Sequence, residues 1–276
     1  MVLDRTVKPR PQRRRPGRRA LLLGTALALL VAIAASVASA ELIEHGNLFV
    51  RFDGGIAPRA LPRRALAPIS VRVEGTIRVP AGERPPALQR LKIALNRAGK
   101  IDTHGLPICR PGQIDSVDPS QALAACGRAL VGSGGIVGET TLPNQRSTTV
   151  RGEVLFFNGV EGGSRTILAH VFETEPTPST HVFAFTIHRG RGAYGTVLTA
   201  EIPAVLRHNE SGRLRSIFLQ LERRYTYRGR KRSYLSAACS APQGFDLATF
   251  PFARASMTFE DGRMLSSTLV RSCRVR

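Results

Sequence analysis

The stretch Ile69-Ser70-Val71-Arg72-Val73-Glu74-Gly75-Thr76-Ile77-Arg78-Val79 decides the fold class. Apart from Gly75, its odd-numbered positions are apolar, and its even-numbered positions are polar. A period of two is typical of a β-strand with one face in a core and the other in water. The segment therefore predicts a strand of a sheet that buries one face.

Similar apolar runs, separated by turn residues, recur along the rest of the chain. Candidate turns are Ala98-Gly99, Asn158-Gly159, residues 161–163, residues 190–192 and Asp261-Gly262. The turn at Ala98-Gly99 predicts a hairpin into Lys100 and Ile101, and Asp-Gly between alternating runs is a strong hairpin signal. Short strands with glycine-rich turns predict an all-β fold, an antiparallel β-sandwich or barrel-like sheet. The further strands are expected at residues 91–95, 154–157, 167–172, 183–187, 217–221, 253–259 and 265–273.

One short helix is expected among these strands. Asp118 can cap it, Pro119 suits its first position, and an alanine-rich run continues to Gly132. Gly132-Ser133-Gly134-Gly135 then reads as a hinge after the helix. The helix would carry one cysteine, Cys126.

The chain contains four cysteines, an even number that predicts two disulfides if the protein matures in an oxidising compartment. Three pairings are possible. The expected one joins nearest neighbours, because each bond then closes a short local loop, and it would tether the helix through Cys109. No clustered cysteine or histidine spacing of a zinc site is present, so no metal is expected. The cysteines are Cys109, Cys126, Cys239 and Cys273.

The first forty residues have the pattern of an export segment. Eight basic residues precede an uncharged run over residues 20–40, which closes with Ala38-Ser39-Ala40. We expect either cleavage after Ala40 or retention of residues 20–40 as a membrane anchor. Both alternatives place the remainder in the secreted fraction or on the outer face of the plasma membrane. Arg18-Arg19 ahead of the apolar run leaves the general secretory and twin-arginine routes both open.

Beyond Ala40 the chain keeps 32 basic and 19 acidic residues, a net charge of +13. Such a charge favours polyanionic partners without specifying one. Residues 41–68 are interpreted as an N-terminal strand with a proline- and glycine-rich flexible linker from Asp53 onward. Residues 69–276 form the expected β-rich domain, with two packed subdomains over about 69–145 and 146–276 as an alternative.

The chain carries few candidate catalytic or cofactor motifs. Residues 190–195 match G-x-G-x-x-G, but a strand-like run follows instead of a helix, so a hairpin loop is the interpretation and no cofactor is expected. The six histidines show no metal-ligand spacing. Three of them, His170, His181 and His188, lie on neighbouring expected strands and could meet in space. The others are His45, His104 and His208.

The most strongly charged stretch is residues 223–234, in which basic residues alternate with Tyr225, Tyr227 and Tyr234. At a hairpin tip, such residues could hold phosphates or other anions. Alternatively, the charges protect the exposed edge of a solvated hairpin. No nucleic-acid-binding motif accompanies the stretch, so nucleic acid is not the expected partner. The candidate anion-binding residues are Arg223, Arg224, Arg228, Arg230, Lys231 and Arg232.

Four segments carry a resemblance: Gly105-Leu106-Pro107-Ile108-Cys109, residues 126–132, residues 232–239, and Asp261-Gly262 with Cys273. Together they resemble a group of uncharacterised exported proteins from high-GC actinobacteria. The resemblance implies an extracytoplasmic, disulfide-bonded protein and no particular activity. The first functional expectation is a non-catalytic envelope or secreted binding module for an acidic wall polymer, an anionic lipid surface or an envelope protein. The alternative is an extracytoplasmic hydrolase with a site of dispersed Ser, His and Asp residues.

Overall fold

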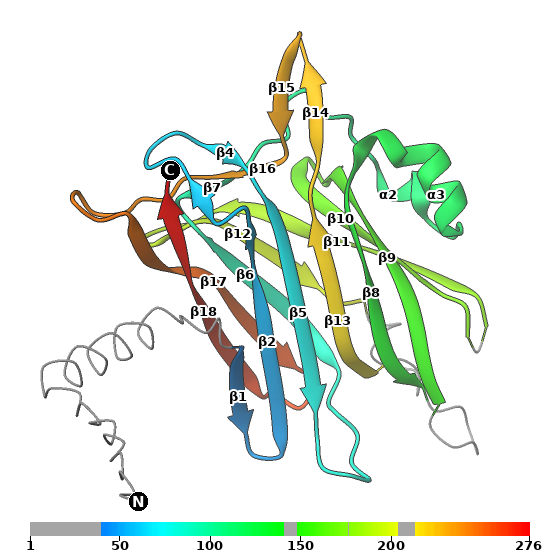
Figure 1. Ribbon diagram of the computed structural model, residues 1–276. Helices are drawn as coiled ribbons and strands as arrows, with labels where there is room; N and C mark the ends of the chain where they lie inside the picture. The colour runs from blue at the N-terminus through cyan, green and yellow to red at the C-terminus, as the bar shows by residue number, and fades with distance from the viewer. Residues whose placement is uncertain (1–39, 141–147, 176, 204–212) are drawn as a thin grey trace, which may run out of the picture. The chain divides into compact units, whose positions relative to one another are not determined.

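A computed structural model describes residues 40–140, 148–175, 177–203 and 213–276. The expected export segment lies outside this part, apart from Ala40. Thirteen described strands form one curled sheet, antiparallel except for the final pair, which confirms the all-β antiparallel prediction (Figure 1). In sheet order they are β1 (Glu41–His45), β2 (Leu48–Ala57), β5 (Ser70–Arg78), β13 (Arg213–Leu221), β8 (Leu130–Thr140), β9 (Thr148–Glu161), β10 (Ser164–Glu173), β11 (Ser179–Arg189), β12 (Tyr194–Glu201), β6 (Leu88–Asn96), β17 (Leu247–Phe259), β18 (Met264–Val275) and β3 (Ala60–Leu61).

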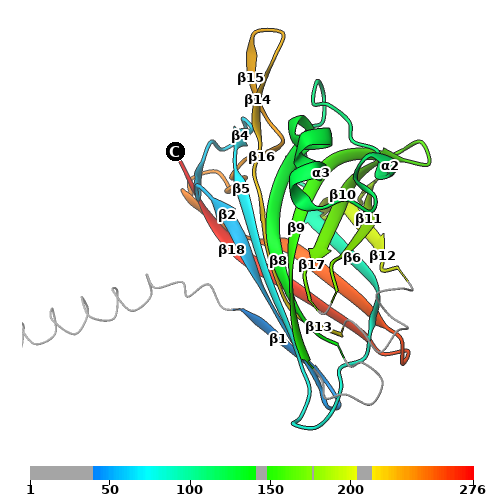
Figure 2. The same cartoon turned by 90° about the vertical axis from the view of Figure 1, so that its right-hand side faces the viewer.

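The alternating segment that begins at Ile69 is β5, and it lies between β2 and β13. Its apolar positions face the interior of the curled sheet, where Val71 and Val73 pack against the main core cluster. Figure 1 shows β2, β5, β13 and β8 in front of β12, β6 and β17, and Figure 2 shows these layers from the side. The core fills the space between them.

The curl brings the two ends of the sheet together without a backbone ladder. β1 and β2 contact β18, although they are far from it in sheet order. Arg271 of β18 lies on the buried face and donates hydrogen bonds to the backbone oxygen of Gly54 and the carboxylate of Asp53, both on β2. We call this junction the seam. Side chains hold it closed, because no described strand pairing spans it.

Two small sheets lie beside the main one. β16 (Leu235–Ala237) pairs with both β4 (Ala67–Pro68) and β7 (Gly99–Ile101), and β14 (Arg224–Tyr227) pairs with β15 (Arg230–Ser233). The expected hairpin between residues 91–96 and 100–101 is wrong, because β6 pairs with β12 and β17 while β7 pairs with β16. The β14–β15 hairpin projects beyond the end of the main sheet in both views (Figure 1 and Figure 2).

Two helices, α2 (Pro111–Ile114) and α3 (Pro119–Cys126), cover the outer face of the sheet near β9, β10 and β11. Asp118 caps α3 as expected, since its carboxylate accepts a hydrogen bond from the backbone N–H of Gln121. The sheet is consequently buried on both faces here: Phe157 and Leu168 pack beneath the helices. None of the helices within the described ranges is long and apolar enough to span a bilayer.

The helix ends earlier than the sequence predicts. After Cys126 the chain forms one 3-10 turn, η1 (Gly127–Ala129), and enters β8 at Leu130. The expected hinge at Gly132–Gly135 is wrong, because these glycines pair with β9 and β13. A Cβ atom at Gly134 would lie 2.1 Å from the backbone oxygen of Phe218, so close strand packing requires glycine there.

Two other loop predictions are also corrected. Asn158-Gly159 is not a turn but part of β9, and its hydrogen bonds go to the segment before α2: Asn158 donates to the backbone oxygen of Pro107. The expected flexible linker from Asp53 to Pro68 contains the end of β2, all of β3 and β4, and the fully buried Leu61. The loops at residues 161–163, 190–195 and 261–262 do connect antiparallel strands, as expected.

The described chain from Ala40 onward forms one unit. β5, β6 and β8 come from the first expected subdomain, yet they alternate in the sheet with strands of the second. Both halves therefore share one core.

Candidate functional site

All four cysteines are paired, and each bonds its nearest neighbour in sequence, as expected. Cys109 bonds Cys126, and Cys239 bonds Cys273, with Cα atoms 5.5 Å and 5.7 Å apart. The first bond ties α3 to the segment ahead of α2. The second ties β18 to the chain after β16. Among the described residues, no group of three His, Cys, Asp or Glu side chains is arranged to hold a metal ion.

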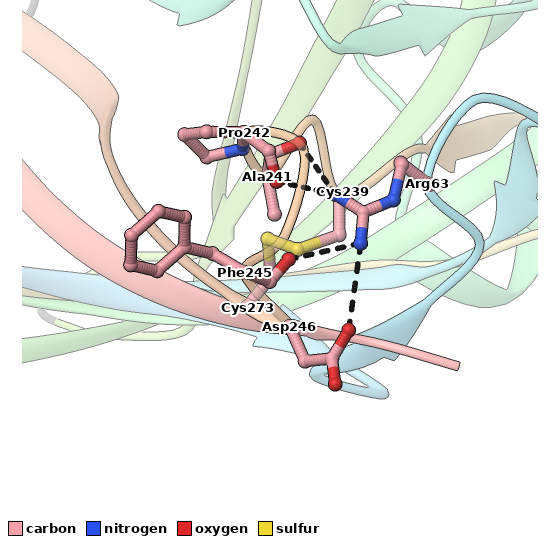
Figure 3. The surroundings of a disulfide bond; sticks show 7 residues. All are labelled: Arg63, Cys239, Ala241, Pro242, Phe245, Asp246 and Cys273. Carbon is pink, nitrogen blue, oxygen red and sulfur yellow. Dashed lines mark hydrogen bonds and ion pairs between the residues drawn. A yellow bond between two sulfur atoms is a disulfide. The ribbon is translucent and has the colours of Figure 1, made fainter.

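Arg63 organises the chain around the second disulfide (Figure 3). Its guanidinium donates to three backbone oxygens, those of Ala241, Pro242 and Phe245, at 2.6–2.9 Å, and lies 3.4 Å from the carboxylate of Asp246. Because its donors are directed at the protein's own backbone, we interpret Arg63 as a structural residue that shapes residues 241–246.

The strand histidines do not meet. His170 pairs with Val182 and His181 pairs with Val171, so their side chains point to opposite faces of the sheet. His170 is fully buried under the helices, where its Nε2 lies 2.9 Å from the backbone oxygen of Val117. His181 lies on the inner face, where burial lowers its pKa, and His188 lies near the far end of β11. His208 is outside the described residues. Among the described residues, the strand histidines therefore do not assemble the metal site considered from the sequence.

The basic stretch at residues 223–234 forms the predicted hairpin, and its pairing sorts the side chains onto two faces. Tyr225 lies opposite Arg232, and Thr226 lies opposite Lys231. Since paired residues share a face, the tyrosines and Arg232 point one way, while Arg224, Thr226 and Lys231 point the other. The left-handed backbone at Arg228 and Gly229 forms the turn at the tip.

The tyrosine face packs against residues 102–104. The hydroxyl of Tyr225 donates to the backbone oxygen of His104 at 2.8 Å, and the ring of Tyr227 meets the His104 ring edge-on at 5.0 Å. Burial raises the pKa of Tyr225, with a further upward contribution from Asp102 and an opposing one from Arg232. The carboxylate of Asp102 accepts a hydrogen bond from Arg232 at 3.1 Å. These contacts hold the hairpin in a defined position.

The hairpin borders an open cleft of about 620 Å³, and residues of both its faces, including Tyr225 and Arg232, line it. Four cations line it: Lys100 from β7, Arg224 from β14, and Lys231 and Arg232 from β15. One carboxylate, that of Asp102, also lines it and is paired with Arg232. Within the described chain, Lys100, Arg224 and Lys231 have no carboxylate partner, so the cleft carries an excess of positive charge. Leu66, Pro68 and Ser236 contribute to its lining.

The structure thus divides the six candidate anion-binding residues. It brings Arg224, Lys231 and Arg232 into the cleft. Arg223 is half-buried, and its Nε is enclosed without a hydrogen-bond partner in the described chain. Arg228 and Arg230 lie near the tip, away from the cleft lining; the Arg228 guanidinium lies 5.3 Å from the ring of Tyr227.

Lys100 is a cleft residue that sequence reasoning missed. It is 124 residues from Arg224, and the two meet because β7 pairs with β16, which directly follows the hairpin. Its position in a short turn segment gave no sign of this pairing. Comparison with protein-family models, with curated proteins and with solved structures finds no match to this chain.

Proposed function

We propose that this chain is an exported, non-catalytic binding module that holds an acidic polymer of the cell envelope in the cleft beside β14 and β15. The observation that carries the proposal is the set of three cations, Lys100, Arg224 and Lys231, which line one cleft without carboxylate partners in the described chain. Ammonium and guanidinium groups are the natural donors for phosphate or carboxylate oxygens. The two disulfides support an oxidising compartment and thus an extracytoplasmic location.

An extended polymer suits this cleft better than a lipid bilayer does. The tip of the hairpin presents Arg228 and Gly229, which have no apolar side chain to insert between lipid tails. The tyrosines of β14 are occupied by their contacts with residues 102–104. The cleft is open, so an extended chain can place successive charged units in it, whereas a single buried anion would need an enclosed pocket.

The experiment compares two double variants of the same hairpin. Arg224→Ala with Lys231→Ala removes two cleft cations, whereas Arg228→Ala with Arg230→Ala removes two cations outside the cleft. Because both lower the net charge by two, non-specific attraction changes equally. We expect the cleft variant to bind polyphosphate or polyglutamate about 10-fold or more weakly, with a flatter salt dependence, and the tip variant to stay within about 3-fold of the parent.

Binding is measured on the purified, disulfide-bonded protein at several salt concentrations, and polyphosphate and polyglutamate separate phosphate from carboxylate recognition. Equal losses for the two double variants would show that only overall charge attracts the polymer and would overturn the proposal. Binding to vesicles containing phosphatidylglycerol, with neither polymer bound, would also overturn it in favour of a lipid surface.

A further inference from the structure

A second cavity lies inside the curled sheet and shares no lining residue with the basic cleft. It has a volume of about 110 Å³ and is lined by strands of both layers, including β6, β8, β9, β10, β11 and β13. Its lining side chains are apolar with one exception. Val154, Phe156, Val171, Phe183 and Phe185 are representative of the apolar set, and the exception is Glu173.

Glu173 is a charged group in apolar surroundings. It lies at the end of β10, directly opposite Gly152, on the face that carries Ala169 and Val171. In the described chain its carboxylate has no hydrogen-bond or ion-pair partner. A half-buried carboxylate loses part of its hydration, and a partner of opposite charge would offset that cost. Burial accordingly raises the pKa of Glu173.

The backbone beside Glu173 leaves room for its side chain. A Cβ atom on Gly152 would lie 3.1 Å from the Cγ of Glu173 and 3.0 Å from the Cγ1 of Ile136. A side chain at position 152 would therefore crowd the Cγ atom of Glu173. The glycine lets Glu173 lie across β9 at the cavity, where an occupant can reach it.

We propose that this cavity binds a small amphiphile, an aliphatic chain of about six carbons with a primary ammonium group, whose chain fills the apolar space and whose ammonium pairs with Glu173. The volume sets the order of size, since an engineered apolar cavity of about 150 Å³ holds benzene and this cavity, at about 110 Å³, admits only a short chain. The charge follows from the carboxylate, because a ligand with its own carboxylate would be repelled and an uncharged ligand would leave Glu173 unpaired. This site is independent of the basic cleft, which selects the opposite charge.

The test uses three ligands of equal chain length: hexylamine, 1-hexanol and hexanoate. Binding to the purified protein is followed at neutral pH through the methyl NMR signals of Val154 and Val171, which line the cavity. We expect hexylamine to bind about 10-fold more tightly than 1-hexanol, and hexanoate to bind at least about 10-fold more weakly than 1-hexanol.

Variants then assign the preference to one carboxylate. Glu173→Gln should reduce the hexylamine advantage to less than about 3-fold while 1-hexanol binding is kept. The matched control is Glu153→Gln, on the neighbouring strand but exposed on the opposite face, and it should leave all three affinities unchanged. Ala169→Phe should fill the cavity and abolish 1-hexanol binding; if that variant fails to fold, the Glu173→Gln result decides alone. No methyl shift with any ligand, or the same response from Glu173→Gln and Glu153→Gln, would overturn the proposal.

Discussion

The carboxylate of Glu173 lowers the stability of the ligand-free protein, although the proposed amphiphile site uses it to bind an ammonium group. Burial raises its pKa above the ordinary value of 4.5, so the folded protein holds this proton to a higher pH than the unfolded chain does. The folded state therefore binds more protons than the unfolded state as the pH rises from that value through the folded pKa. Stability falls over that window, and the loss persists at neutral pH.

We predict that Glu173→Gln makes the ligand-free protein more stable than the parent at pH 7. Below pH 4.5 the difference should shrink, because the parent's carboxyl is then protonated in both states. The measurement is thermal or denaturant unfolding of both proteins from pH 4 to pH 8. The exposed Glu153→Gln should show no such trend, and a constant difference across the range would contradict the assignment.

Helices α2 and α3 form a layer on the outer face of the sheet, and the disulfide between Cys109 and Cys126 holds this layer together. Neither helix is long enough to be stable alone, and together they cover Phe157, Leu168 and the fully buried His170. The bond joins Cys109 to Cys126, 17 positions apart in sequence. It lowers the conformational entropy of the unfolded chain and so stabilises the folded state. It also keeps α3 close to the segment that hydrogen-bonds Asn158.

We predict that Cys109→Ser with Cys126→Ser lowers the free energy of unfolding by about 3 kcal/mol. The loss should be accompanied by faster amide hydrogen exchange in α3 and in the part of β10 under the helices, while β17 and β18 keep their protection. Guanidinium denaturation and hydrogen exchange provide the two readouts. Uniformly faster exchange across the whole sheet would show that the bond does not act through this layer.

The whole sheet depends on how its ends meet at the seam. Arg271 is 7% exposed, and it bonds Asp53 and the backbone of Gly54 across a junction that has no strand pairing in the described chain. Asp53 supplies a carboxylate to this buried guanidinium, and loss of the carboxylate from a buried ion pair is destabilising. The seam also includes hydrogen bonds from Arg263 to the β1–β2 turn and apolar contacts of Phe52 with Leu269, and the Arg271–Asp53 pair is its buried ionic contact.

We predict that Asp53→Asn costs about 2 kcal/mol of unfolding free energy, since Asp53 itself is partly exposed. Glu74→Gln on the adjacent strand breaks an exposed ion pair with Arg72 and should cost less than about 0.5 kcal/mol. Urea or guanidinium unfolding compares the two. Similar losses for both variants would mean that the seam pair contributes no more than a surface pair.

Local patterns in the sequence determined several of the elements. The alternation in β5, the Asp-Gly turn between β17 and β18, and the Asp118 cap of α3 each depend on neighbours within a few residues, so they can be read without the fold. The basic hairpin was predicted in the same way. The neighbouring pairing of the cysteines also followed from short separations in sequence.

The tertiary structure alone decided which elements meet. Gly132 and Gly134 read as a hinge, but β13, some 85 residues away, makes them part of a strand. Lys100 joins the cleft through β16, and Glu173 becomes a lone carboxylate in an apolar cavity only when six strands close around it. Strand pairing is a long-range choice among many similar apolar runs, and it is made by burial of the whole curled sheet, which no local period encodes.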